Sequence, residues 1–161
     1  MKNQTCCFTG HRDIPAADHD ALGRRLEEEI LALIREGVRF FGAGGALGFD
    51  TLAALCVLKL RESFPDIRLI LVLPCKNQTR GWRDADIETY NLIRDRADKV
   101  VYVSEGYYSG CMQKRNRYLV DAAGVCVCYL TGNSGGTAYT VNYARKNGVR
   151  VVNLAELYRE L

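Results

Sequence analysis

The sequence repeats one local pattern: a short apolar run, a glycine-rich loop, and then apolar residues at helical spacing. The clearest copy spans Phe40 to Thr51, where the apolar run ends in four glycines within seven residues and a helix follows. A second copy runs from Val125 through the glycines between residues 132 and 136 into another helix. Alternating strands and helices predict an α/β fold, in which a mostly parallel sheet with right-handed connections carries helices on both faces.

Apolar periodicity predicts about six strands and six helices. The strands are expected over residues 5–9, 38–41, 67–73, 99–103, 125–130 and 149–154, and the helices over residues 18–36, 50–63, 84–96, 112–123, 138–145 and 155–161. No linker, internal repeat or low-complexity segment interrupts this order. Because 161 residues suffice to bury a sizeable core, a single domain over residues 1–161 is expected.

The overall composition places few limits on function. Charged residues make up 25% and hydrophobic residues 48% of the chain, as in ordinary globular proteins. A formal net charge of +3 permits anion binding but lacks the strong basic excess typical of nucleic-acid-binding proteins. The first residues carry no apolar signal core and no apolar run reaches membrane length, so a cytoplasmic location is expected.

The seven cysteines fit a reducing compartment better than a disulfide framework. Cys6, Cys7, Cys126 and Cys128 lie inside strand-like apolar runs, which predicts small buried hydrophobic side chains. The chain contains no C-x-x-C motif, and its two histidines show no metal-ligand spacing. We therefore expect no metal site.

The glycine loop after Phe41 is suited to holding an anion. Glycine lets a ligand approach the backbone, and the first turn of the following helix presents N–H groups without partners. Gly42 and Gly44 open like a dinucleotide-binding fingerprint, but Gly48 falls one residue late for G-x-G-x-x-G, and no P-loop motif is present. A phosphate cradle and a simple tight turn are both open interpretations of this loop.

Three loops that follow strands, beginning at Gly10, Gly42 and Gly132, are expected to converge along one edge of the sheet. His11 and Arg12 stand directly after the first strand. The guanidinium of Arg12 suits a phosphate, because its fork pairs with two oxygens at once. His11 is a candidate donor to a ligand or to a backbone carbonyl, and a solvated loop is the alternative for both residues.

Other side chains have two interpretations each. Asp50, in the first turn of the helix after the glycine loop, either caps that helix or binds a ligand hydroxyl. Trp82 either stacks on a base or anchors the helix over residues 84–96. Arg115 and Asn116 either reach a ligand or form a polar network within the helix packing, where Asn116 falls on the apolar stripe.

Taken together, these residues resemble the YpsA-like family of the SLOG superfamily of Rossmann-like domains. The matching segments cover nearly the full chain: Phe8–Arg12, Gly44–Asp50, Pro74, Trp82, Arg115–Arg117 and Gly135–Thr137. The resemblance implies a Rossmann-like three-layer sandwich and a nucleotide or ADP-ribose-type ligand, with a link to cell division or stress. It implies no firm reaction.

Parts of the chain are also similar to two other SLOG families. The first glycine loop resembles that of DprA, which implies single-stranded nucleic-acid binding, and the Gly-Gly-Thr loop resembles that of the LOG phosphoribohydrolases. The LOG helix carries a Glu pair where this chain has Tyr139 and Thr140, which supply no negative charge at neutral pH. The favoured hypothesis is therefore a nucleotide-binding sensor or regulator rather than an efficient hydrolase, with the other two activities as alternatives.

The residues expected to bind this ligand lie in the loops and helix starts described above. They are Gly10, His11, Arg12, Gly44, Gly45, Gly48, Asp50, Trp82, Arg115, Asn116, Gly135, Gly136 and Thr137. No catalytic residue and no cofactor other than a nucleotide-type ligand is assigned. The expected partner is a small nucleotide-like molecule; nucleic acid is less favoured, a membrane span is not expected, and a homo-oligomer is open.

Overall fold

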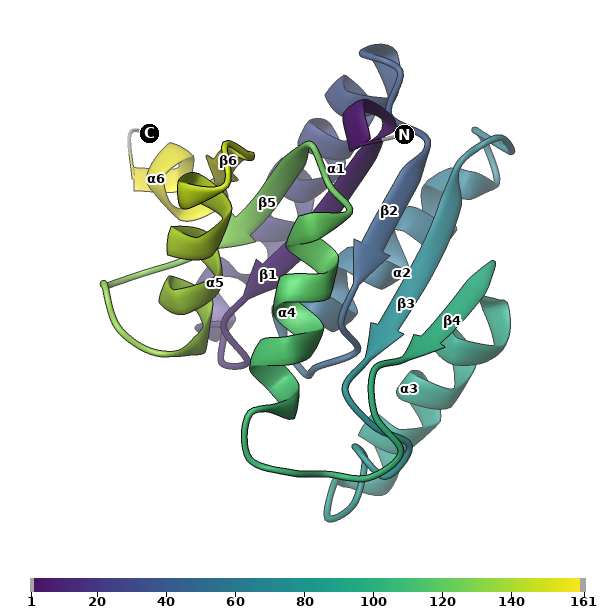
Figure 1. Ribbon diagram of the computed structural model, residues 1–161. Helices are drawn as coiled ribbons and strands as arrows, with labels where there is room; N and C mark the ends of the chain where they lie inside the picture. Colours follow the sequence, from purple (N-terminus) through teal and green to yellow (C-terminus); the bar gives the residue numbers. More distant parts are fainter. Residues whose placement is uncertain (1, 160–161) are drawn as a thin grey trace.

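The computed structural model describes residues 2–159, and side chains as far as residue 156 (Figure 1). It contains one sheet of six parallel strands in the order β4-β3-β2-β1-β5-β6. The strands are β1 (Thr5–Gly10), β2 (Phe40–Ala43), β3 (Arg68–Leu73), β4 (Lys99–Tyr102), β5 (Val125–Tyr129) and β6 (Arg150–Asn153). The predicted α/β, Rossmann-like fold is confirmed.

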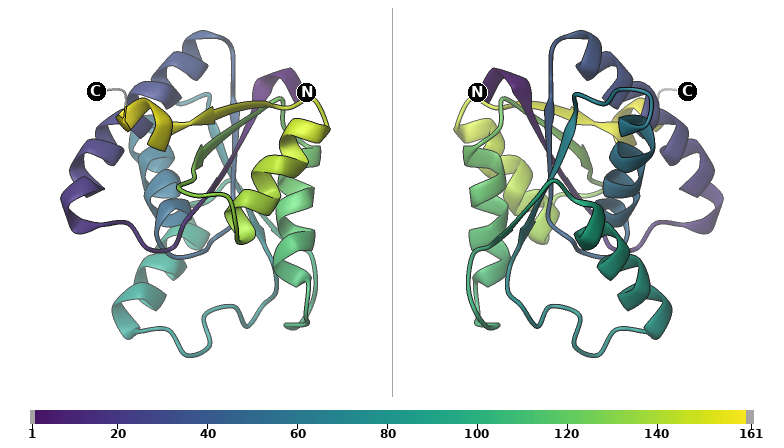
Figure 2. Two further views of the ribbon diagram at one scale, coloured as in Figure 1. Left: turned by 90° about the vertical axis from the view of Figure 1, so that its left-hand side faces the viewer. Right: turned by 90° about the vertical axis from the view of Figure 1, so that its right-hand side faces the viewer.

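Helices cover both faces of this sheet, as Figure 2 shows. The helices are α1 (His19–Arg35), α2 (Phe49–Arg61), α3 (Asp84–Arg96), α4 (Cys111–Asp121), α5 (Gly136–Lys146) and α6 (Leu154–Arg159), with short 3-10 turns at Lys2–Gln4 and Ala16–Asp18. Helices α1, α2, α3 and α6 form one layer, and α4 packs beside α5 in the other. None of the helices in the described part of the chain combines the length and the apolar character needed to cross a membrane.

The order of the strands explains the two layers. From the central strand β1 the chain moves outward through β2, β3 and β4, and α1, α2 and α3 make these crossovers. It then returns to place β5 on the other side of β1. Because each parallel crossover is right-handed, this reversal sends α4 and α5 to the opposite face. The carboxyl ends of β1 and β5 therefore form a switch point, where open α/β sheets bind ligands.

Side chains alternate between the two layers along each strand. In β1, Phe8 packs into the core beneath α1 and α2, whereas its neighbour Cys7 packs toward α4 and α5. Cys126 and Cys128 of β5 share the α4–α5 side with Cys7, and each of these thiols is at most 1% exposed. The prediction that the strand cysteines are small buried hydrophobic residues is confirmed, and all seven cysteines are free thiols.

Candidate functional site

A polar pocket of about 280 Å³ opens at the carboxyl end of β1, between the first turns of α2, α4 and α5. Its lining combines eight of the thirteen residues expected from the sequence with three others. The expected ones are Gly10, His11, Arg12, Asp50, Arg115, Asn116, Gly136 and Thr137, and the additional ones are Thr9, Ala46 and Met112. Segments separated by more than a hundred residues in sequence thus meet at the switch point of the sheet.

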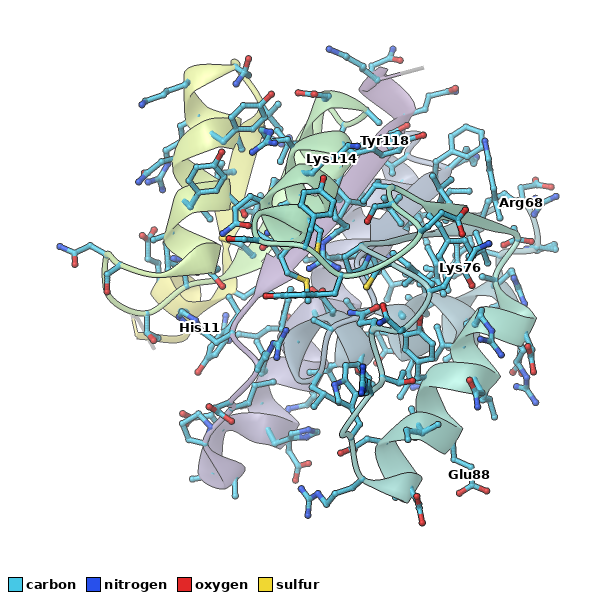
Figure 3. The ribbon with its side chains drawn as sticks, turned by 60° about the horizontal axis from the view of Figure 1, so that its bottom comes forward. His11, Arg68, Lys76, Glu88, Lys114 and Tyr118 are labelled. Carbon is cyan, nitrogen blue, oxygen red and sulfur yellow. The ribbon has the colours of Figure 1, made fainter. Side chains whose placement is uncertain are left out.

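His11 joins the end of β1 to the loop that precedes α5. Its Nε2 lies 2.9 Å from the backbone nitrogen of Thr131 and 3.1 Å from the carbonyl oxygen of the same residue. Nε2 is therefore placed to accept the Thr131 N–H. The ring also stands edge-on against Tyr129, and Figure 3 shows His11 near the end of β1, on the α5 side of the site. His11 is therefore a clamp between two of the site loops.

Asp50 does not cap α2, although capping was one of the two roles that the sequence left open for it. Gly48 occupies the N-cap, and Oδ2 of Asp50 instead accepts a hydrogen bond of 3.3 Å from the backbone N–H of Ala46. The hydroxyl of Thr51 donates to the carbonyl of Ala46 at 2.9 Å. The backbone N–H and the carbonyl of Ala46 are therefore both hydrogen-bonded to side chains of α2. Burial raises the pKa of Asp50, against the opposing effects of Arg115, the Ala46 hydrogen bond and Arg12.

Arg115 is the most deeply buried charged side chain of the pocket lining, with only 4% of its surface exposed. Its Nη1 donates to the carbonyl of Gly44, its Nε donates to Oδ1 of Asn116 at 2.7 Å, and its Nη2 approaches Sδ of Met112 at 3.8 Å. Burial lowers the pKa of this guanidinium, while Asp50 opposes the shift; arginine nevertheless stays charged in proteins. These contacts use three of its five N–H groups, and the side chain also lines the polar pocket.

The guanidinium of Arg115 packs directly against the backbone of Gly44. A Cβ at this position would stand 2.5 Å from Nη1 of Arg115, closer than real Cβ contacts allow. The glycine is therefore required by a side chain of α4 and not by direct exposure to the pocket, which it does not line.

The other glycines of the first loop also serve packing. Gly45 has a φ of +75°, and a Cβ there would overlap Leu73 of the core. Gly48 has a φ of +77°, and a Cβ there would overlap the carbonyl oxygen of Arg12. This close approach lets the chain after β1 lie on the start of α2, where the N–H of Phe49 donates to the carbonyl of His11 at 3.1 Å. Of the loop over residues 42–48, Ala46 reaches the pocket.

The start of α5 presents open backbone to the pocket. Gly135 is the N-cap with a φ of +94°, and the first bond within the helix runs from the N–H of Tyr139 to the carbonyl of Gly135. The N–H groups of the residues between them have no partner inside the helix. A Cβ built on Gly136 meets nothing within 4 Å, so open space lies above this turn. Gly136 and Thr137 line the pocket, whereas Gly135 lies just outside it.

Trp82 does not reach the pocket. Its ring packs edge-on against Tyr90 of α3, with ring centroids 5.6 Å apart, and its half-buried side chain packs against the core on the α1–α3 side of the sheet. Of the two interpretations of Trp82, the structure places it as a packing anchor for α3.

Two further hollows differ in the character of their linings. An apolar one of about 310 Å³ lies beside α4 against β1, β2, β3 and β4, and Lys99 is its charged lining residue. An open groove of about 680 Å³ crosses the N-terminal ends of α4 and α5 and meets the polar pocket at Gly136. Sequence reasoning missed the groove, because no pattern along the chain brings the loop before α4 to the start of α5.

The comparisons with known proteins agree with this architecture. The YpsA model, described as the YspA SLOG family, matches residues 9–153. A UPF0398 protein of Halalkalibacterium halodurans is 36% identical over 126 residues, which is 76% of this chain and 67% of the relative. The SPbeta prophage-derived protein YoqJ of Bacillus subtilis is 33% identical over 140 residues, covering 76% of this chain and 81% of the relative.

Two solved structures of DNA processing protein A share the fold. The protein from Helicobacter pylori, whose structure describes a single-stranded DNA binding mode, superposes with a TM-score of 0.63 at 16% identity. DprA from Streptococcus pneumoniae superposes with a TM-score of 0.65 at 14% identity. The matches cover 93% and 91% of this chain but only 64% and 48% of those longer chains. With its family model matched almost end to end, this chain belongs to the YpsA family of SLOG proteins.

Proposed function

We propose that the chain binds a phosphorylated nucleoside in the polar pocket at the end of β1. The observation that carries this proposal is the convergence of three anion-binding features on one cavity: the open N-terminus of α5, the buried guanidinium of Arg115, and the exposed guanidinium of Arg12. A pocket at the switch point of a parallel sheet is also the usual place for a nucleotide in such folds.

The parts of the ligand follow from the polar groups available. The phosphate lies against the N–H groups of Gly136 and Thr137, with the two arginines on either side of its charge. The amide nitrogen of Asn116 remains to donate to the nucleoside, because its Oδ1 already accepts from Arg115. Asp50 adds the carboxylate that accepts from a ribose hydroxyl or a base N–H.

The same residues favour binding over cleavage of the glycosidic bond. Cleavage develops positive charge on the ribose and needs a carboxylate to stabilise it or to activate water. Asp50 is the acidic residue among those that line the pocket, and it holds the Ala46 backbone. At the positions of the LOG Glu pair, Thr140 donates to the carbonyl of Gly136 and Tyr139 accepts from Arg117 at 3.0 Å.

The test is calorimetric titration of the wild-type protein and of arginine variants with adenosine 5′-monophosphate. Loss of one charged hydrogen bond to the ligand lowers the affinity by an amount that calorimetry can measure. Arg12→Ala should weaken the affinity about tenfold, as expected for loss of one charge-assisted bond of about 1.5 kcal/mol. Arg24→Ala is the matched control, because this exposed arginine of α1 lies outside every described pocket lining. Absence of binding to the wild-type protein, or equal losses in both variants, would contradict the proposal.

The hydrolase alternative is tested by chromatography of the same mixtures. We expect no multiple-turnover release of adenine from the monophosphate or from ADP-ribose. Base release that disappears in Asp50→Asn would make the protein an enzyme and would replace the binding proposal.

A further inference from the structure

We propose that the groove across the N-terminal ends of α4 and α5 is a stacking shelf for a second nucleobase, joined through phosphate to the nucleoside in the polar pocket. This inference rests on the proposed function. The two cavities meet at Gly136, which lines both. A phosphate bound at the start of α5 therefore stands at their junction, with one cavity on each side.

Two exposed tyrosines give the shelf its chemistry. Tyr108, from the loop before α4, is 44% exposed, and Tyr139, in the first turns of α5, is 42% exposed; both line the groove. Aromatic side chains that keep this much surface in water offer faces on which bases stack without regard to sequence. Neither ring belongs to the two buried clusters of the core, so their packing inside the fold does not account for them.

Arg117 positions Tyr139 and gives the groove its positive charge. Its Nη1 donates to the hydroxyl of Tyr139 at 3.0 Å, which joins α4 to α5 across the groove. The remaining lining residues are Ser109, Gly110, Gln113, Gly135 and Gly136, so the described lining contains one cation and no acidic residue. Such a surface suits a phosphate-linked base, because the linking phosphate meets positive charge and the base meets an aromatic face.

The glycines keep the path between the cavities open. A Cβ built at Gly110, Gly135 or Gly136 meets nothing within 4 Å. The backbone of both helix starts is therefore bare where the linking group would cross from the pocket to the shelf. Two kinds of molecule carry this chemistry: a dinucleotide linked by pyrophosphate and a short single strand linked by phosphodiester.

The experiment compares probes that differ only by the second nucleoside. Diadenosine 5′,5′-diphosphate is compared with ADP, and the 5′-phosphorylated diadenylate pApA is compared with adenosine 3′,5′-bisphosphate, all by calorimetry. In at least one pair the second adenosine should raise the affinity by about tenfold, the size expected for one stacked base. The pair that responds identifies the linkage.

The variants assign that gain to the shelf. Tyr139→Ala should bring the ratio of affinities in the responding pair close to one, and Tyr139→Phe should keep most of it because the ring remains. Tyr118→Ala is the control. This tyrosine, labelled on α4 in Figure 3, is similarly exposed at 45% but lines the apolar hollow instead of the groove. Thermal melts of each variant check that the fold is retained.

The results that would refute the proposed function differ from those that would refute the shelf alone. If no probe binds the wild-type protein, the proposed function is wrong and the shelf with it. If ADP or the bisphosphate binds but a second adenosine adds nothing, the shelf alone is wrong. The shelf is equally refuted if the gain survives in Tyr139→Ala.

Discussion

Replacing Arg115 by methionine tests the structural role of this side chain, which lines the polar pocket and is also hydrogen-bonded to Gly44 and Asn116. Methionine fills a similar space but removes the donors to Gly44 and Asn116. The two lost charge-assisted bonds are worth about 1.5–3 kcal/mol each, and the buried carbonyl of Gly44 is left without this donor. The methionine variant no longer buries a charge, and the desolvation cost that it avoids offsets several kcal/mol of this loss.

The net expectation is a free energy of unfolding lower by about 1–3 kcal/mol. For a domain of this size, this loss corresponds to a fall in melting temperature of about 2–12 °C. Urea denaturation followed by the fluorescence of Trp82 measures the difference, and calorimetry on the same sample measures loss of binding of adenosine 5′-monophosphate.

The effect of Arg115→Met should also depend on pH. The guanidinium lowers the pKa of Asp50, so its removal raises that pKa further above the ordinary value of 3.8. A carboxyl whose pKa is raised by folding stabilises the protein fully below its unfolded pKa, and this stabilisation is lost as pH rises through the folded pKa. The gap between variant and wild type should therefore widen from pH 4 to pH 8. Equal stabilities within about 0.5 kcal/mol, or a gap that narrows with rising pH, would refute the role given to Arg115.

Three further predictions follow from the same geometry. Asp50→Asn should stabilise the protein at pH 8 relative to wild type and lose this advantage toward pH 4, because ionising the buried carboxyl is unfavourable; urea melts across this range decide it. Gly48→Ala should cost about 2–4 kcal/mol, because alanine is strained at positive φ and its Cβ would overlap the Arg12 carbonyl; thermal unfolding by circular dichroism checks this loss. Trp82→Ala should lower stability by about 1–3 kcal/mol through lost packing on Tyr90, yet leave the affinity for adenosine 5′-monophosphate unchanged in calorimetry.

The sequence predicts the fold well because the apolar runs and the glycines that end them indicate the same strands. Continuous apolar runs such as residues 67–73 suit a strand covered on both faces, and the glycines mark where strands end. The convergence of the loops after β1, β2 and β5 follows from the rule that parallel strands share their carboxyl edge. The same rule predicts that the loops carrying Arg12, Asp50 and Gly136 meet, and these three residues line one pocket.

What the sequence does not predict depends on contacts between distant segments. A glycine packed against the guanidinium of Arg115 has the same local sequence pattern as a glycine that cradles phosphate, so the sequence alone leaves both interpretations of Gly44 open. Asp50 was equally ambiguous, because its hydrogen bond to Ala46 depends on how the loop folds back. The shelf of Tyr108 and Tyr139 exists only because β5 lies next to β1, which brings α4 beside α5.

Amide NMR spectra show whether a nucleoside phosphate binds at the start of α5. Titration of the ¹⁵N-labelled protein with adenosine 5′-monophosphate should shift the backbone signals of Gly136 and Thr137 and the side-chain Nε signal of Arg115. The indole signal of Trp82, which lies outside the pocket, should stay in place. A spectrum that does not change on titration, or changes centred on Trp82 with the α5 signals unmoved, would rule out nucleoside phosphate binding at the start of α5.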